Sequence, residues 1–187
     1  MIFLGSQETK ENRKLMLGLD AEVFGAEMLY QQTPEVADRI NSIMSVYAAA
    51  LSDDRKTMLA YLSMTVVCDR YYRKLLRGEV KAEEFEPWDQ KDTAVLFLRN
   101  LVVRDRRATP YIFRTATKEL LQLCADYEIY LHRCFTIATH WITRRALALY
   151  GFQEVGKYEG KHPIMLASRD ESAVLNSFLK RYETPKP

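Results

Sequence analysis

The strongest constraint on the fold is a ten-residue apolar run, AVLFLRNLVV, at residues 94–103. It is polar only at Arg99 and Asn100, as is typical of a central strand buried on both faces. A helical pattern over 110–129 and a second apolar run at 134–138 follow. Because a crossover of this length joins parallel strands, we expect these two strands to be parallel neighbours.

The loop between this strand and the helix is basic, with Arg104, Arg106 and Arg107 in close succession. Thr109 and Pro110 then predict an N-cap and a first helical position. A helix N-terminus presents unpaired N–H groups and a partial positive charge, so the junction is a candidate site for an anion such as phosphate. The alternative is a solvated turn whose arginines only maintain solubility.

The rest of the chain predicts alternating strands and helices without internal repeats. The expected strands are 2–4, 46–51, 57–67, 94–103, 134–138, 152–158 and 163–167, and the expected helices are 9–30 (broken near Gly25), 33–44, 69–77, 110–129, 141–150 and 170–182. Polar turns at 52–56 and 159–160 indicate two hairpins. The predicted class is therefore mixed α/β (α+β), with a central, mostly antiparallel sheet flanked by helices.

Composition narrows the class of protein. A length of 187 residues predicts one domain, and 48% hydrophobic with 28% charged residues is typical of a folded globular chain. The net charge of +2 disfavours a dedicated nucleic-acid binder. No apolar run approaches the roughly 18 residues of a membrane span, and residues 1–6 do not resemble a signal peptide, so we expect a soluble, cytoplasmic protein.

Cysteine and histidine spacing predicts neither disulfides nor a metal. The three cysteines are scattered, which indicates a reducing compartment, and no histidine has a ligand at metal-binding spacing. These residues are Cys68, Cys124, Cys134, His132, His140 and His162. Cys134 also lacks a neighbouring base, so we do not expect it to be a nucleophile.

The stretch ALYGFQEVG at 148–156 carries an aromatic residue followed by Gly151 and Phe152 at the end of a predicted helix. Together with the order strand, basic loop, helix, strand, helix and hairpin, it resembles the GNAT superfamily of acyl-CoA-dependent N-acyltransferases. The resemblance covers about residues 45–168. Around this core, a single acyltransferase-like domain over 1–187 would add the N-terminal helices of 9–44, the C-terminal helix at 170–182 and a disordered tail at 184–187.

The resemblance implies a slot between the diverging strands that binds acetyl-CoA or another acyl-CoA. Strand backbone would hold the pantetheine arm, and the following loop and helix start, including Ile112, would hold the pyrophosphate. The cofactor-binding residues implied in this way are Leu101, Val102, Val103, Arg104, Arg107, Ala108, Thr109, Tyr111 and His140.

Two positions depart from the family pattern. The usual loop is Arg/Gln-x-x-Gly-x-Gly/Ala, and counting from Arg107 the glycine positions hold Pro110 and Ile112. Proline donates no N–H, and isoleucine hinders close backbone approach. Either the arginines replace the missing donors with charge-assisted bonds, or the phosphate grip is lost.

The candidate catalytic residues are His140 and Tyr150. The tyrosine that many family members place four residues before the Gly-Phe pair is Leu147 here. Tyr150 would be a displaced acid or a core-packing residue, and His140 a cofactor ligand or proton carrier, or a satisfied polar residue at a strand end. Tyr61, Ser63 and Thr65 could line an acceptor pocket or form a polar strand face.

The sequence thus predicts an N-acyltransferase that transfers an acetyl or other acyl group to an amine of a small molecule or protein. The alternatives are an enzyme that takes its acyl group from an acyl carrier protein, with the arginines docking an acidic partner helix, or a degenerate, non-catalytic binding module. The apolar spacing of Val174, Phe178 and Tyr182 predicts that the last helix packs on the core or on a twin subunit, as in a homodimer.

Overall fold

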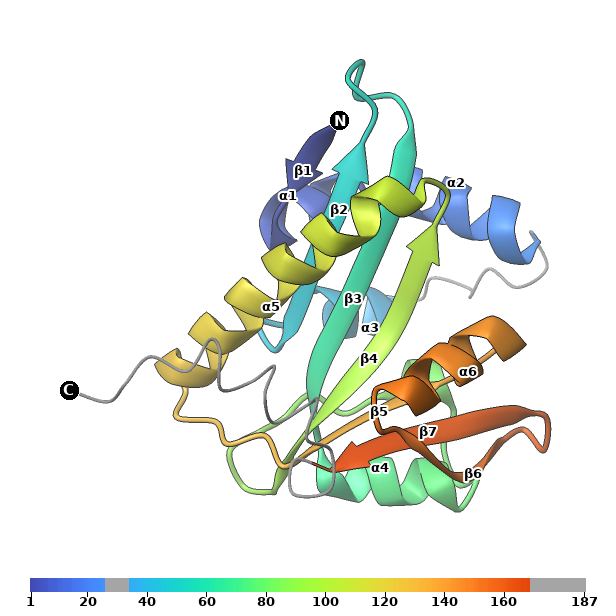
Figure 1. Ribbon diagram of the computed structural model, residues 1–187. Coiled ribbons are helices and arrows are strands. Elements are labelled where there is room, and N and C mark those ends of the chain that lie inside the picture. The colour runs from blue at the N-terminus through green and yellow to red at the C-terminus, as the bar shows by residue number, and fades with distance from the viewer. Residues whose placement is uncertain (26–33, 169–187) are drawn as a thin grey trace. The chain divides into compact units, whose positions relative to one another are not determined.

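The computed structural model describes residues 1–25 and 34–168, and it confirms the mixed α/β class (Figure 1). Over these residues, seven strands form a mostly antiparallel sheet in the order β1-β2-β3-β4-β5-β7-β6. The strands are β1 (Ile2–Leu4), β2 (Ser45–Leu51), β3 (Met58–Cys68), β4 (Ala94–Val103), β5 (Arg133–Ile137), β6 (Gln153–Tyr158) and β7 (His162–Ser168). The helices are α1 (Ser6–Glu11), α2 (Arg13–Phe24), α3 (Pro34–Asn41), α4 (Asp69–Leu76), α5 (Thr109–Asp126) and α6 (Trp141–Leu149), with short 3₁₀ turns η2 (Ala82–Glu84) and η3 (Arg106–Ala108).

The chain forms two compact units. The first comprises Met1–Thr65 with Arg99–Leu123, and the second comprises Val66–Leu98 with the described residues from Cys124 onward. Strand β4 contributes its first half to the second unit and its second half to the first.

In the first unit, β2 and β3 form the predicted hairpin, and every residue of β2 is buried. Alternation places Tyr47, Ala49 and Tyr61 on one face, where they pack with Met16 and Leu19 of α2. Helix α5 crosses the other face of these strands (Figure 1). Its inward stripe repeats every four residues at Ile112, Ala116 and Leu120, as an amphipathic helix requires.

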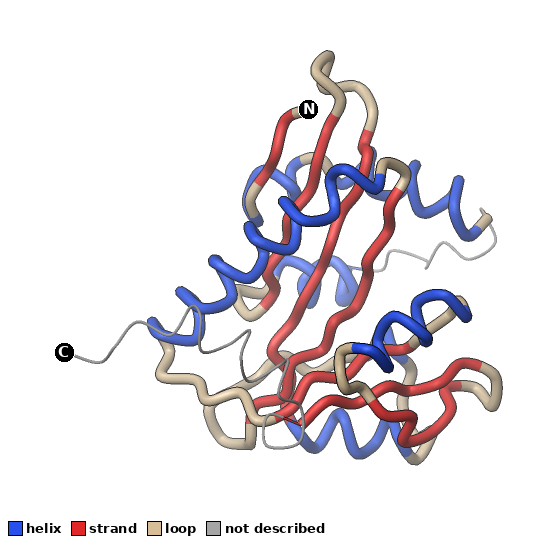
Figure 2. The backbone as a smooth tube through the Cα atoms, in the orientation of Figure 1, coloured by secondary structure: helices blue, strands red, loops and turns tan. Residues whose placement is uncertain are grey.

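The second unit contains the crossover partner strands. β4 and β5 are parallel, with Leu96 opposite Cys134 and Phe97 opposite Phe135, which confirms that they are parallel neighbours. The rings of Phe97 and Phe135 stack with centroids 4.4 Å apart and planes 6° from parallel. The divergence of the strands stays a prediction. In the tube view of Figure 2, α4 and α6 border the strands of this unit.

Several element boundaries differ from the prediction. The helix expected over 9–30 is two helices, because Asn12 interrupts it and its side-chain Nδ2 donates to the Glu8 carbonyl at 2.8 Å. α2 ends at Gly25, whose φ of 88° suits glycine. α3 ends at Asn41, short of the expected residue 44.

The prediction that β4 is buried on both faces is wrong for its second half. Ala94–Phe97 are buried, whereas the next residues are only half-buried and Leu101 is 36% exposed. The expected N-cap Thr33, the C-terminal helix at 170–182 and the tail at 184–187 lie outside the described residues.

The described helices include none that is both long and apolar enough to cross a membrane. Across residues 1–25 and 34–168, no group of three or more His, Cys, Asp or Glu side chains could hold a metal ion. The three cysteines are free.

Candidate functional site

The predicted anion site lies where β4 passes into α5, within the first unit. The backbone N–H groups of Arg104 and Asp105 both donate to the Leu59 carbonyl, at 2.8 and 2.9 Å, which anchors the loop to β3. Asp105 then accepts from the Arg107 N–H at 3.0 Å and caps η3, which runs directly into α5.

Asp105, and not Thr109, is therefore the cap, and the prediction of a Thr109 N-cap is wrong. Thr109 has helical backbone angles, φ −53° and ψ −50°, and begins α5. An aspartate side chain readily accepts from a backbone N–H two residues further on, so η3 starts before the Thr-Pro pair is reached. Pro110 still occupies the first turn of α5, where a missing N–H breaks no hydrogen bond.

Two of the three loop arginines form ion pairs inside the unit. Arg107 Nη2 lies 2.7 Å from Asp105 Oδ2, and Arg104 pairs with Glu22 of α2. The Arg107 side chain remains 83% exposed. Arg106 is exposed, and its side chain has no ion-pair or hydrogen-bond partner over the described part of the chain.

Asp105 places a negative charge at this helix start. Hydrogen bonds from the Arg107 side chain and backbone hold the pKa of Asp105 below its ordinary value, so the carboxylate is ionised at neutral pH. The carboxylate takes one of the N–H groups that the family resemblance reserves for pyrophosphate. Arginine side chains at the loop surface are then the remaining donors with full charge.

The other predicted cofactor residues of this unit follow one another along the chain, but their side chains differ in access. Val102 is 1% exposed and belongs to the core cluster, and Ala108 is fully buried. Leu101 is exposed, whereas Val103 and Thr109 are half-buried. The ring of Tyr111 stacks on Phe3 of β1, with centroids 4.8 Å apart. The side chains of Val102 and Ala108 are therefore inaccessible, and these two residues could contact a ligand only through their backbone groups.

A partly buried chain of hydrogen bonds, which the sequence did not reveal, involves Asn100 in the second half of β4. The Tyr61 hydroxyl donates to Asp20 Oδ1 of α2 at 2.6 Å, and Asn100 Nδ2 donates to the Tyr61 hydroxyl at 2.8 Å. Burial raises the pKa of Asp20, while the hydrogen bond from Tyr61 opposes this shift. Burial and then the charge of Asp20 raise the pKa of Tyr61 well above its ordinary value, so Tyr61 stays protonated.

Arg99 reaches the same face as Asn100. Its Nη1 donates to the Tyr47 hydroxyl at 3.1 Å, and Tyr47 and Tyr61 share one face of the β2–β3 hairpin. The only signal in the sequence was that Arg99 and Asn100 are polar inside an apolar run.

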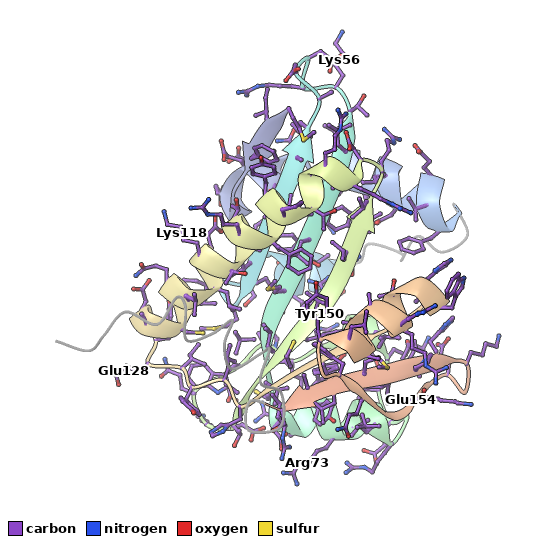
Figure 3. The ribbon with its side chains drawn as sticks, viewed as in Figure 1. Lys56, Arg73, Lys118, Glu128, Tyr150 and Glu154 are labelled. Carbon is purple, nitrogen blue, oxygen red and sulfur yellow. The ribbon has the colours of Figure 1, made fainter. Side chains whose placement is uncertain are left out.

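The candidate catalytic residues lie in the second unit, on either side of α6. His140 immediately precedes the helix and is exposed, and its ring stacks with Trp141 at a centroid distance of 6.0 Å. Tyr150 immediately follows the helix (Figure 3). At 1.5 Å per residue the two are about 15 Å apart along the helix axis, so they are not brought together.

Tyr150 is not a core residue. It is 58% exposed, which overturns the core-packing interpretation. Gly151 follows at φ 84°, a value that glycine adopts without strain, and ends the helix so that the chain can enter β6. The neighbouring side chain of Arg144 pairs with Glu154 of β6 at 2.8 Å.

The cysteines are poor nucleophiles. Burial raises the pKa of Cys134 and of Cys124 to about 12, and that of Cys68 to about 11. A thiolate is the reactive form of cysteine, so these values agree with the expectation that Cys134 performs no covalent chemistry.

Comparison with solved structures shows the GNAT fold. Arabidopsis thaliana NAA60 in complex with acetyl-CoA matches with a TM-score of 0.54 and 10% identity, covering 90% of this chain and 98% of that one. The same protein in complex with a bisubstrate analogue gives 0.50 and 13% over 88% and 94% of the two chains. The GNAT domain of S. lividans PAT gives 0.51 and 9% over 89% of each. No family model matches the sequence, and no curated protein does.

Proposed function

We propose that this protein is an N-acyltransferase that moves an acetyl or other acyl group from coenzyme A to an amine of a small molecule or protein. The observation that carries the proposal is the parallel β4–β5 pair joined through α5, in a sheet whose fold is shared with NAA60 in complex with acetyl-CoA. In this arrangement β4 is followed by the basic loop and η3, which lead into the start of α5.

The reaction needs orientation more than covalent help from the protein. The amine nitrogen attacks the thioester carbonyl carbon, the C–N bond forms, and the C–S bond breaks. The nitrogen loses one proton to solvent, and the coenzyme A thiolate takes up one proton. Backbone N–H groups at Leu101–Val103 would stabilise the oxyanion that forms on the carbonyl oxygen.

The surface arginines would hold the pyrophosphate in place of a glycine-rich loop. Arg107 has an exposed guanidinium, and the side chain of Arg106 has no partner within the described residues. Binding would draw the Arg107 side chain from Asp105 to the phosphate, with Asp105 retaining its backbone hydrogen bond. His140 and Tyr150, both exposed, remain candidates for contacts with the cofactor or for proton transfer.

A second candidate function is a non-catalytic binding module. The observation in its favour is the Asp105 carboxylate, which occupies an N–H and adds negative charge where a phosphate would bind. Repulsion between like charges would weaken the affinity for coenzyme A.

Calorimetric titration with acetyl-CoA at fixed salt distinguishes these functions. We expect the parent protein to bind, and a ligand at 100 times its dissociation constant to add about 2.7 kcal/mol to the free energy of unfolding. Asp105→Asn should bind acetyl-CoA several-fold more tightly, because the amide can still cap η3 without the charge. If neither protein binds acetyl-CoA, the proposal of an N-acyltransferase that uses coenzyme A is wrong. Titration with an acyl carrier protein then distinguishes an enzyme that takes its acyl group from that carrier from a non-catalytic binding module.

A further inference from the structure

We propose that Asn100 orients the attacking amine through its side-chain oxygen Oδ1, and that Tyr61 and Asp20 behind it hold the amide in that orientation. This rests on the proposed N-acyltransferase function and adds to it a contact for the acceptor.

The direction of the hydrogen bonds follows from the single proton of the Tyr61 hydroxyl. Its distance to Asp20 Oδ1 is 2.6 Å and its distance to Asn100 Nδ2 is 2.8 Å. The amide nitrogen has no lone pair to accept with, so Asn100 must donate, and the hydroxyl proton must go to Asp20. The chain therefore runs in one direction, from Asn100 through Tyr61 to a carboxylate.

This direction fixes which way the Asn100 amide faces. With Nδ2 committed to Tyr61, the oxygen Oδ1 points away from the hydroxyl, and over the described residues it has no hydrogen-bond partner. Asn100 is half-buried, so this oxygen is not sealed within the core. An unpartnered carbonyl oxygen in a polar, partly accessible place is suited to accept an N–H from a ligand.

The charge at the end of the chain makes Oδ1 a better acceptor. Hydrogen bonds in a chain polarise one another, and donation from Nδ2 toward an anion increases the negative charge on the amide oxygen. Tyr61 is 1% exposed, which keeps water from competing for its hydroxyl. The hydrogen bond from Tyr61 and the charge of Arg99 both favour the ionised form of Asp20 and oppose the effect of burial on its pKa.

The position along β4 matches the chemistry. Asn100 directly precedes Leu101–Val103, the backbone that the proposed function assigns to the thioester. An amine that donates one N–H to Asn100 Oδ1 keeps its lone pair free for the carbonyl carbon. The acceptor class is therefore an amine that carries an N–H; a carboxylate or a phosphate, which can only accept, does not fit this contact.

The experiment follows release of the coenzyme A thiol with three primary amines: a peptide with a free amino terminus, a peptide with one lysine and a blocked amino terminus, and spermidine. Asn100→Ala and Tyr61→Phe should each raise KM for the amine at least tenfold, while acetyl-CoA affinity stays within twofold. Asp20→Asn should also raise KM for the amine, by three- to tenfold. Tyr71→Phe is the matched control, because Tyr71 is also a buried tyrosine whose hydroxyl donates to a carbonyl, that of Ala82 at 3.0 Å, in the second unit.

An unchanged amine KM in Asn100→Ala, or an equal loss in Tyr61→Phe and Tyr71→Phe, overturns the proposal. So does a parent protein that binds acetyl-CoA but acetylates none of the three amines. A parent that does not bind acetyl-CoA refutes the proposed function instead.

A second measurement on the parent alone covers variants that fail to fold. The side-chain amide resonances of Asn100, in protein labelled with ¹⁵N at asparagine, should shift saturably when spermidine or either peptide is added in the presence of coenzyme A. Resonances that stay in place with all three amines overturn the proposal.

Discussion

The two halves of β4 are built on different principles. Ala94–Phe97 are buried, and Phe97 stacks on Phe135 inside an aromatic core cluster. Arg99–Val103 are mostly half-buried, and the side chains of Arg99 and Asn100 donate hydrogen bonds to Tyr47 and Tyr61. The first half is specified by burial of apolar side chains. The second half carries polar side chains, whose burial costs free energy unless they form hydrogen bonds.

The difference separates a half that is specified by apolar packing from a half whose polar side chains are oriented by hydrogen bonds. Apolar burial is non-directional and stabilises any side chain of suitable size. A hydrogen-bonded chain such as Asn100–Tyr61–Asp20 stabilises less but fixes the orientation of each group. Variants in the two halves should therefore differ in what they change.

The largest effect is expected from Phe97→Ala. It removes a stacked ring that is 3% exposed and should lower the free energy of unfolding by about 3–5 kcal/mol, as measured by urea denaturation. Leu101→Ala, in the other half and 36% exposed, should cost less than about 1 kcal/mol. Similar losses for both variants would remove the distinction between the halves.

The next effect concerns the loop that follows the polar half. If Arg107 binds pyrophosphate, Arg107→Ala should weaken acetyl-CoA binding by roughly tenfold to a hundredfold, the equivalent of about 1.5–3 kcal/mol for a charge-assisted contact. Arg104→Ala is the control expected to matter less, since Arg104 pairs with Glu22. Calorimetry at fixed salt is the measurement, because salt screens exposed charges. A parent that binds no better than Arg107→Ala would refute this phosphate contact.

The smallest effect is expected in the pH dependence of the free energy of unfolding, to which Asp20 and Asp105 contribute with opposite signs. Burial raises the pKa of Asp20, so the folded protein binds that proton more readily and gains stability as the pH falls through the raised pKa toward the unfolded value of about 3.9. The pKa of Asp105 is lowered by Arg107, so its contribution is present above the unfolded value and is lost as the pH falls through the folded one.

Urea midpoints between about pH 2 and pH 7 check these two signs, because the change due to Asp105 lies below its unfolded pKa of about 3.9. Asp20→Asn should lack the gain in stability that the parent shows as the pH falls. Asp105→Asn should show a smaller loss of stability at low pH than the parent. If Asp20→Asn follows the parent at every pH, then Asp20 does not titrate as its burial implies.

Local signals predicted much of the fold. The bounds of β4 at 94–103, the parallel partner strand and the hairpin turn at Glu159–Gly160 follow from apolar periodicity, crossover length and turn residues, all of which are short-range features. The same signals failed at Asn12 and Asp105, where side-chain hydrogen bonds to the backbone decided where a helix starts or stops.

The candidate site was less accessible to sequence reasoning. Asp20 and Tyr61 are 41 residues apart, and Tyr61 and Asn100 are 39 apart, so no local pattern connects them. Asp105 lies within the basic loop, where the Thr109-Pro110 pair predicted the cap at Thr109 instead. The role of Asp105 as cap depends on backbone angles that composition does not specify. Contacts between residues far apart in the chain are set by tertiary packing, so they produce no regular residue spacing from which they could be predicted.

The suppressed acidity of the three cysteines has a practical consequence at the bench. With pKa values of about 11 to 12, fewer than about one thiol in a thousand is ionised at pH 7.5. Disulfide dyes and maleimides react with the ionised form, so the folded protein contributes little background signal of its own. A colorimetric thiol reagent can therefore be kept in the cuvette throughout a test of the proposed acyl transfer, where a rapid rise in colour would measure release of the coenzyme A thiol.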